Sequence, residues 1–251
     1  MSWNLLKLFS KSSAARIADG VRIYAIGDIH GCSGPLGQLL DRIAADISAF
    51  PSNRSILIFL GDYIDRGADS SKVIDQLVNL QEHKKAVFLK GNHESCLIKF
   101  LKNPPFIKEW FQYGGLDTLC SYGITPQNYL DPKEQVFLAN ALFLELTKRE
   151  HLRFFEGLKL SFTCEDFFFV HAGVRPGVPL DQQVEQDLLW IRNDFLDHEG
   201  EFEKIVVHGH TPTFRPEVRN NRINIDTGAY ATGRLTCLII ERDWMKFISS
   251  E

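Results

Sequence analysis

The clearest indication of the fold is the run Ile56-Leu57-Ile58-Phe59-Leu60, followed at once by Gly61-Asp62-Tyr63-Ile64-Asp65-Arg66-Gly67. The first five residues are all apolar, as in a strand that is buried on both faces of a sheet. The next seven combine turn-forming glycines with two aspartates and an arginine. Because ligands bind at the carboxyl ends of strands in open α/β sheets, this string predicts a strand that delivers polar side chains to a site.

The same arrangement recurs at four other strand-like runs, residues 21–26, 86–89, 167–170 and 205–207. Each run leads into glycine together with Asp, Asn or His. The strings are Gly27-Asp28-Ile29-His30-Gly31, Gly91-Asn92-His93-Glu94, His171-Ala172-Gly173 and His208-Gly209-His210-Thr211. We therefore expect five strand ends to bring metal-ligand residue types to one edge of a sheet. Two further strand-like runs lie at residues 223–225 and 235–240.

Helical patterns lie between the early strands, at residues 35–49 and 70–80, where apolar residues recur at helical spacing. The alternation of strand and helix predicts an α/β fold with crossover helices. Over residues 95–160 the pattern is helical with breaks at Pro and Gly, which predicts a helical insertion. We expect an N-terminal extension over residues 1–20 and one domain over residues 21–251 that contains the insertion.

The chain has 251 residues, of which 44% are hydrophobic, and a formal net charge of −4. A protein that coats a nucleic-acid backbone needs a surplus of Lys and Arg, so this class is disfavoured. We expect no membrane span, because no apolar run is long enough to form one. The five cysteines are scattered and form no CxxC pair: Cys32, Cys96, Cys120, Cys164 and Cys237. These features predict a cytoplasmic protein with reduced thiols.

Six residues in the strings have side chains that bind divalent metals: Asp28, His30, Asp62, Asn92, His171 and His210. Oxygen donors mixed with imidazole suit Mn, with Fe or Zn as alternatives. Six ligands exceed the needs of one tetrahedral site, and a central carboxylate such as Asp62 can bridge two ions. Two ions about 4 Å apart lower the pKa of a bridging water and yield a hydroxide nucleophile for in-line attack on phosphorus. The sequence thus predicts a phosphoester hydrolase.

Taken together, the strings GDxHG, GDxxDRG and GNHE with the later histidines resemble the calcineurin-like metallophosphoesterases. Within that family they resemble the short bacterial phosphoprotein phosphatases, over roughly residues 21–241. The resemblance implies a four-layer αββα sandwich with a helical insertion and a dinuclear metal centre. It implies that Asp28 and His30 hold one ion and that Asp62 bridges both. The second ion would also be held by Asn92, His171 and His210.

The same resemblance assigns catalytic and substrate-binding roles. His93 is expected to be the general acid that protonates the leaving oxygen, with Asp65 orienting it. A carboxylate partner raises the pKa of a histidine, which suits proton donation. Arg66 and Arg192 are expected to clamp the phosphate, because a guanidinium can meet two phosphate oxygens at once.

Other polar residues are expected to have structural roles. His208 is expected to be a weaker candidate than His210 for a direct role at the site. Glu94 is expected to cap a helix, and Asp226 is expected to form a turn. Three histidines stand among charged residues and are predicted to lie at the surface: His83, His151 and His198. A loosely docked terminus is favoured over a membrane-binding amphipathic stretch for the apolar residues near the start of the chain, which are Leu5, Leu6, Leu8 and Phe9.

The leading functional hypothesis is a serine/threonine protein phosphatase, acting on a phosphorylated protein or a small phosphoester. The alternative is a dinucleoside tetraphosphate hydrolase with a related fold. Asp65 favours the protein phosphatase, because the dinucleotide hydrolases typically replace this aspartate. A non-catalytic scaffold on the same fold is disfavoured because no ligand-type residue is missing. A DNA-processing phosphodiesterase is disfavoured by the balanced charge.

Overall fold

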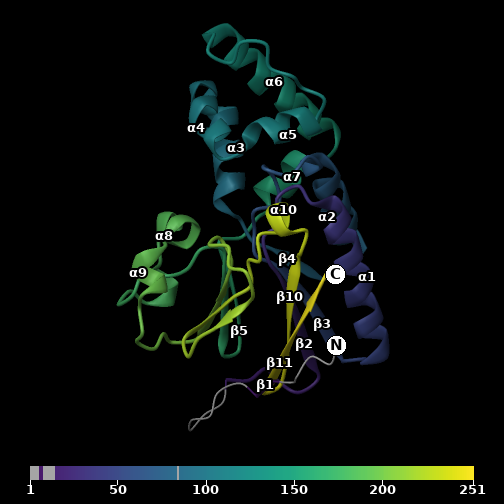
Figure 1. Cartoon of the computed structure of the whole chain (residues 1–251), viewed down its shortest axis with the longest axis vertical. Coiled ribbons are helices and arrows are strands. Elements are labelled where there is room, and N and C mark those ends of the chain that lie inside the picture. Colours follow the sequence, from purple (N-terminus) through teal and green to yellow (C-terminus); the bar gives the residue numbers. More distant parts are fainter. Residues whose placement is uncertain (1–5, 8–14, 84) are drawn as a thin grey trace.

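Two β-sheets pack face to face in the computed structural model, which describes residues 6–7, 15–83 and 85–251 (Figure 1). In this part of the chain the larger sheet has the strand order β1 (Leu6–Lys7), β11 (Trp244–Ser249), β10 (Thr236–Glu241), β2 (Val21–Ile26), β3 (Arg54–Phe59) and β4 (Ala86–Phe88). The smaller sheet has the order β5 (Ser161–Cys164), β6 (Phe167–Val170), β7 (Ile205–His208), β9 (Arg222–Asn224) and β8 (Glu217–Val218).

Strand β2 shows why both faces of the larger sheet are apolar. Successive side chains of a strand point to opposite faces. Ile23 and Ala25 belong to the core between the sheets, together with Phe167 from the smaller sheet, whereas Tyr24 and Ile26 belong to the core under the outer helices. Strands β2, β3 and β4 run parallel to one another, so their carboxyl ends meet at one edge.

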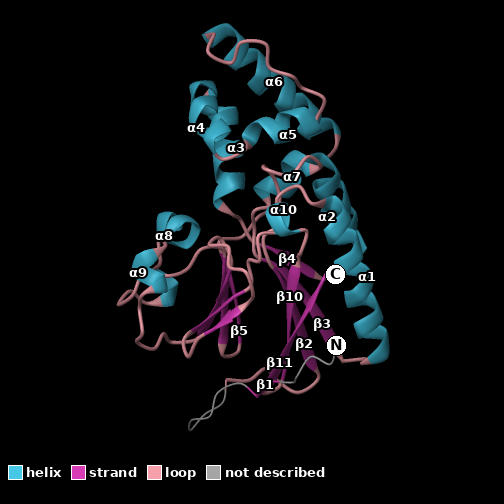
Figure 2. Cartoon of the chain, viewed as in Figure 1, coloured by secondary structure: helices cyan, strands magenta, loops and turns pink. Residues whose placement is uncertain are grey.

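Helices cover the outer face of each sheet (Figure 2). On the larger sheet, α1 (Ser33–Ala49) and α2 (Ser70–His83) contribute Leu36 and Leu77 to the outer core. On the smaller sheet, α8 (Glu185–Trp190) and α9 (Asn193–Leu196) cluster around Phe168 with Leu188 and Phe195. The predicted four-layer αββα sandwich is therefore confirmed.

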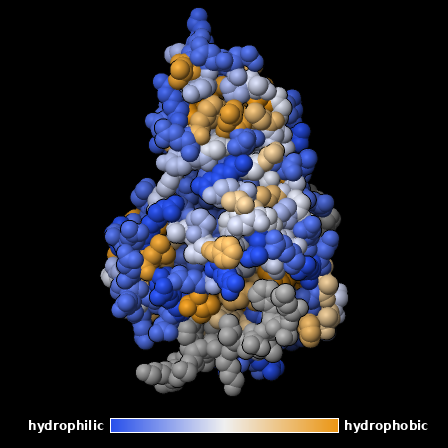
Figure 3. Space-filling view, in the orientation of Figure 1, coloured by the Kyte–Doolittle hydropathy of each residue, from blue (hydrophilic) through white to orange (hydrophobic). Residues whose placement is uncertain are grey.

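Residues 92–156 form helices beyond the carboxyl ends of the larger sheet's parallel strands (Figure 1). They are α3 (Asn92–Lys102), the short 3₁₀ helix η1 (Pro104–Phe106), α4 (Ile107–Gln112), α5 (Gly115–Ser121), α6 (Pro132–Lys148) and α7 (His151–Glu156). One face of α6 is buried through Leu138 and Leu142, while Phe137 and Leu144 are exposed. Hydrophobic residues gather at this end of the molecule (Figure 3). Two more short helices, η2 (Leu180–Gln182) and α10 (Ala229–Thr232), lie in the second half of the chain.

The predicted strands agree with observed strands to within two residues at each end, but β1, β5, β8 and β11 are not predicted. Strand β5 is an edge strand with polar residues, and β11 pairs with β10 through a hairpin in which Arg242 has a φ of 52°. Leu6 pairs with Met245 of β11. The predictions for Leu5, Leu8 and Phe9 lie outside the described residues. The division into residues 1–20 and 21–251 stays a prediction. None of the described helices is long and apolar enough to cross a membrane.

His151 does not lie at the surface, so that prediction is wrong. Its side chain is 1% exposed; Nδ1 accepts a hydrogen bond from the Tyr122 hydroxyl at 2.7 Å, and Nε2 donates to Asp75 at 2.9 Å. Charged sequence neighbours suggested exposure, but α7 turns this ring toward the protein. His198 is partly exposed, with its ring 5.1 Å from that of Phe202. The prediction for the His83 side chain lies outside what the structure describes.

Burial lowers the pKa of His151 below its ordinary value of 6.5, despite the neighbouring Asp75. We expect His151→Gln to lower the free energy of unfolding by about 1–3 kcal/mol at neutral pH, because the buried hydrogen bond to Tyr122 and the part-buried one to Asp75 are disturbed. Below pH 6.5, His151 binds a proton more readily in the unfolded wild type than in the folded wild type, so the stability of the wild type falls. The difference in stability between the wild type and His151→Gln therefore narrows. Urea unfolding at neutral and mildly acidic pH measures this. A difference that stays constant with pH would contradict it, and His198→Gln is the control.

Candidate active site

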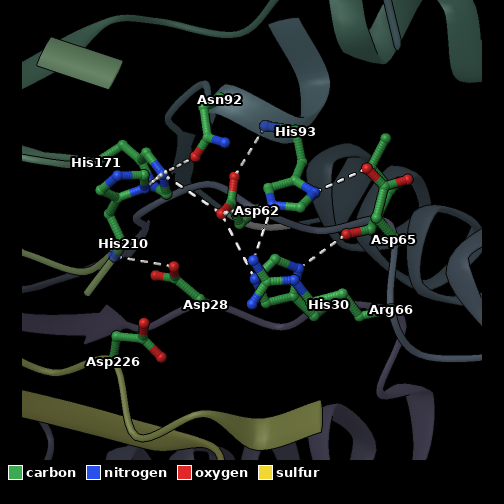
Figure 4. Close-up of polar contacts among 12 residues, drawn as sticks. Asp28, His30, Asp62, Asp65, Arg66, Asn92, His93, His171, His210 and Asp226 are labelled. Atoms are coloured by element: carbon green, nitrogen blue, oxygen red, sulfur yellow. Dashed lines mark hydrogen bonds and ion pairs between the residues drawn. The ribbon is translucent and has the colours of Figure 1, made fainter. Parts of the chain in front are cut away.

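The loops after β2, β3, β6 and β7 meet the start of α3 at the carboxyl ends of the strands (Figure 4). They bring together the six residues predicted to bind metal, each at most 6% exposed: Asp28, His30, Asp62, Asn92, His171 and His210. Two sets of three side chains have donor atoms within 4.8 Å of one another. One set is His30, Asp62 and His93, and the other is Asp62, His171 and His210.

Five non-glycine residues of these loops have a left-handed backbone with positive φ: His30, Asp62, Asp65, Arg66 and His210. This conformation costs a non-glycine residue on the order of 1 kcal/mol. Contacts between loops hold it in place, since the backbone nitrogens of Ile29 and His30 both donate to the Asp62 carbonyl at 3.0 and 2.8 Å. The two loops also approach each other at Gly67, where a glycine is required because a Cβ would lie 2.1 Å from the His30 carbonyl oxygen.

The carboxylate of Asp62 stands between the two sets of side chains. Its Oδ2 atom lies 3.5 Å from Nε2 of His30 and 3.4 Å from Nε2 of His171. Its Oδ1 atom accepts a hydrogen bond from the backbone nitrogen of His93 at 3.2 Å. Burial raises the pKa of Asp62, but the surrounding histidines outweigh this effect and lower it below the ordinary range. The carboxylate is therefore ionised and faces both sets with one oxygen.

The imidazole rings of His30 and His171 are held by backbone carbonyls. Nδ1 of His30 donates to the Ile64 carbonyl at 3.0 Å, and Nδ1 of His171 donates to the Leu60 carbonyl at 3.0 Å. In a neutral ring this leaves Nε2 without a proton, as a metal ligand requires. Burial lowers the pKa of His30 to about 3 and also lowers that of His171, so both rings are neutral at neutral pH.

Several acceptor atoms at the site face one another or have no partner. Nε2 of His171 lies 2.9 Å from Oδ1 of Asn92, although both atoms accept hydrogen bonds in this arrangement. Oδ2 of Asp28 accepts from the backbone nitrogen of His210 at 2.9 Å, whereas Oδ1 of Asp28 and Nε2 of His210 are buried without a hydrogen-bond partner in the described part of the chain. An unpaired buried polar group costs about 1–3 kcal/mol or more. Divalent cations would satisfy the carboxylate oxygen and separate the facing acceptors, so the donor set fits such ions.

His93 lies at the start of α3 between Asp62 and Asp65. Its Nδ1 atom donates to Oδ2 of Asp65 at 2.7 Å, while its Nε2 atom lies 3.7 Å from Oδ2 of Asp62. Burial lowers the pKa of His93, but the Asp62 charge and the hydrogen bond to Asp65 outweigh it, and the pKa is raised. Trp110 and Thr118 donate to the Asp65 carboxylate at 2.9 and 2.6 Å. These two residues, which come from α4 and α5, support Asp65 without any local signal in the sequence.

Both predicted arginines lie next to the ligand sets. The Arg66 guanidinium stands 4.7 Å from the Tyr230 ring centre, with one nitrogen 3.5 Å from Nε2 of His93. Arg192 is exposed and donates to the Thr211 hydroxyl at 3.4 Å, next to His210. Among the described residues, no carboxylate lies within salt-bridge distance of either arginine. Their charges are therefore available to an anion.

The remaining polar residues have structural partners. Glu94 accepts hydrogen bonds from the backbone nitrogens of Asp62, Tyr63 and Gly91 at 2.9, 2.8 and 2.8 Å, so it caps α3 and fixes the loop after β3. His208 is buried and donates to the Gly209 carbonyl at 3.1 Å. Asp226 accepts from the backbone nitrogen of Gly228 at 2.9 Å in a turn, and it also lies near Asp28 (Figure 4). Burial raises the pKa of Asp226 to about 6.

A family profile described as calcineurin-like phosphoesterase matches residues 21–237. The chain belongs to this family. A calcineurin-like phosphoesterase is a metal-dependent hydrolase with a dinuclear centre of divalent ions, so the predicted enzyme class and the predicted use of divalent metal are confirmed at this level. The narrower prediction of a serine/threonine protein phosphatase is not supported by the relatives that follow.

Two curated relatives of this calcineurin-like phosphoesterase are named for a nucleotide substrate and not as protein phosphatases. A protein of Anoxybacillus flavithermus is 29% identical over 235 residues, which cover 85% of this chain and 88% of that protein. A protein of Oceanobacillus iheyensis is 30% identical, with 86% and 87% covered. Both are named bis(5′-nucleosyl)-tetraphosphatase PrpE [asymmetrical]. A solved structure provisionally named a diadenosine tetraphosphatase is 19% identical, has a TM-score of 0.58, and is matched over 94% of this chain and 98% of that chain. At this identity it supports the fold alone.

Gly209 offers a test of the ligand set, because a Cβ there would lie 2.0 Å from Oδ1 of Asp28. We expect Gly209→Ala to displace this carboxylate and weaken Mn²⁺ binding by about 10–100-fold, with an unchanged circular dichroism spectrum. Isothermal titration calorimetry measures the affinity. Gly34→Ala is the control, since a Cβ at position 34 meets nothing within 4 Å. Equal Mn²⁺ affinity in both variants would remove Asp28 from the ligand set.

Proposed function

We propose that this chain hydrolyses bis(5′-nucleosyl) tetraphosphates. The supporting observation is that two relatives with this name, from different genera, match it over 85% or more of its length. The geometry is compatible with a phosphate chain, because two arginines without carboxylate partners in the described part of the chain flank the ligand sets. In the asymmetrical reaction, water adds to the terminal phosphorus of the chain, the bond to the next bridging oxygen breaks, and a nucleoside triphosphate leaves together with a mononucleotide.

A serine/threonine protein phosphatase is the second candidate. The observation that favours it is the pair of His93 and Asp65, joined at 2.7 Å, since the resemblance noted in the sequence links this aspartate to protein phosphatases. An alkoxide leaving group needs a proton more than a phosphate leaving group does, so a strong proton donor is most useful for phosphoserine. The names of the relatives favour the dinucleotide over this substrate.

We assign the metal ligands as follows. Asp28 and His30 would hold one divalent ion, and Asp62 would bridge it to a second ion. The second would also be held by Asn92, His171 and His210. Manganese suits this mixture of oxygen and imidazole donors, with iron or zinc as alternatives. Such ions, when bound, polarise phosphoryl oxygens and lower the pKa of water.

The chain's own residues would orient the substrate and supply a proton. Arg66 and Arg192 would hold the phosphate from two sides and offset the charge that develops during attack. His93 would give the proton on Nε2 to the departing oxygen, while Asp65 holds Nδ1 and keeps the ring in place. Trp110 and Thr118 would fix Asp65, so α4 and α5 act on the reaction through this carboxylate.

The first test compares substrates. With Mn²⁺ present, we expect kcat/KM for diadenosine tetraphosphate to exceed that for a phosphoserine peptide by at least about tenfold, or ~1.4 kcal/mol in the barrier. Chromatography should show equal amounts of ATP and AMP as products. A higher kcat/KM for the phosphopeptide would favour the second candidate, and failure to turn over either substrate would remove both.

The second test concerns His93. We expect His93→Asn to lower kcat for an alkyl phosphate by about 10²–10⁴-fold, because the alkoxide then leaves without a proton. The loss should be much smaller for p-nitrophenyl phosphate and for diadenosine tetraphosphate, whose leaving groups are stable as anions. His198→Asn, at a partly exposed histidine, should change none of these rates. Equal losses on all substrates would argue against proton donation by His93.

A further inference from the structure

A pocket of about 300 Å³ opens between α8 and α9, next to the metal-ligand cluster. Its walls include Arg175, Gln186, Trp190, Ile191, Arg192 and Asn193. This volume is at the lower end of the range for small-molecule sites. None of the roles assigned above to metal ligands or to the proton donor uses this pocket.

The pocket shares two residues with the surroundings of the metal-ligand cluster. The Trp190 ring centre lies 6.3 Å from that of His210 and 5.6 Å from that of Tyr113, whose ring in turn lies 6.1 Å from His93. Arg192 lines the pocket and also contacts Thr211, the neighbour of His210. A ligand held by Arg192 through a phosphate can therefore extend along Trp190 into the pocket.

The charges of the pocket argue against a second phosphate site. The Arg175 guanidinium makes two hydrogen bonds with Asp187, at 2.6 and 2.7 Å, and one with Asp194 at 3.1 Å. Two carboxylates thus outweigh the charge of this one guanidinium. Arg192, in contrast, lies on the side facing the cluster and has no carboxylate partner among the described residues. The part of the pocket away from the cluster therefore has one arginine and two carboxylates, a net charge of −1, which disfavours a phosphate there but admits an uncharged group.

The chemistry of the walls fits a flat, neutral ligand with polar edges. The partly exposed indole of Trp190 supplies the apolar surface, and Ile191 lies beside it with 7% exposure, mostly within the core around Phe168. Gln186 and Asn193 are exposed and carry amides, which both donate and accept hydrogen bonds. Aromatic surface with nearby amides is a common way to hold a nucleobase, because the base stacks and its edge forms hydrogen bonds.

We propose that this pocket binds one nucleobase of the substrate. The base stacks on Trp190, the amides of Gln186 and Asn193 meet its edge, and Arg192 holds the phosphate at the boundary with the metal-ligand cluster. This proposal rests on the proposed function and adds the group that distinguishes a nucleotide from other phosphoesters. Because Trp190 lies next to His210, the bound nucleoside is the one attached to the attacked phosphate, which favours release of a mononucleotide.

The test measures inhibition of p-nitrophenyl phosphate hydrolysis by AMP and by ribose 5-phosphate, which lacks the base. The ratio of the two inhibition constants within one variant reports the base alone. We expect the wild type to bind AMP at least about tenfold more tightly than ribose 5-phosphate, as base stacking on an aromatic residue allows. Trp190→Ala should bring the ratio close to one, and Trp190→Phe should retain part of the preference. Phe137→Ala, at an exposed position on α6, should keep the wild-type ratio.

A ratio near one in the wild type, or a full preference in folded Trp190→Ala, would overturn the proposal. If Trp190→Ala does not fold, Gln186→Ala at an exposed position provides the same readout, and an unchanged ratio there and in Asn193→Ala would also overturn it. Turnover of diadenosine tetraphosphate is measured in parallel. Turnover without a base preference would refute the pocket and keep the proposed function. A base preference without turnover would support the pocket and refute the proposed function.

Discussion

The carboxylate of Asp62 is the element on which the site depends. One of its oxygens faces His30 on one side and His171 on the other, at 3.5 and 3.4 Å. Its neighbours leave it little freedom, since Glu94 accepts from its backbone nitrogen and a Cβ at Gly91 would lie 2.1 Å from its Oδ1 atom. Burial alone would favour the protonated form, and the histidines around it reverse this preference. A buried negative charge of this kind calls for cations.

Both sheets place metal-ligand residue types around this carboxylate. The parallel strands of the larger sheet deliver Asp28 and Asp62 to one edge, and the smaller sheet delivers His171 from the opposite side of the sandwich. Helices α4 and α5 then add Trp110 and Thr118, which hold Asp65 and through it His93. The helices over residues 92–156 thus also support the site, because their side chains form hydrogen bonds with Asp65. Thr118 also accepts a hydrogen bond from the backbone nitrogen of Asp65, one of the residues with a left-handed backbone, at 2.9 Å.

Much of this arrangement could be predicted because it follows from strand ends. Buried parallel strands read as apolar runs, so the positions of Asp28, Asp62 and His171 were visible in the sequence, and the αββα layers followed from the resemblance that these strings support. The supports of Asp65 could not be predicted, because Trp110 and Thr118 are 45 and 53 residues away and nothing local marks them. His151 was misjudged because its charged neighbours do not show which face of α7 is buried. The choice between substrates could not be made from the sequence either, since the same strings serve several phosphoesters, and groups beyond them, such as Trp190, have no pattern of their own.

The most direct test of this account is anomalous X-ray diffraction from crystals of the chain grown with Mn²⁺. We expect two anomalous peaks per chain, both coordinated by the Asp62 carboxylate. One should face Asp28 and His30, and the other should face Asn92, His171 and His210. A single peak, or two peaks that do not share Asp62, would contradict it.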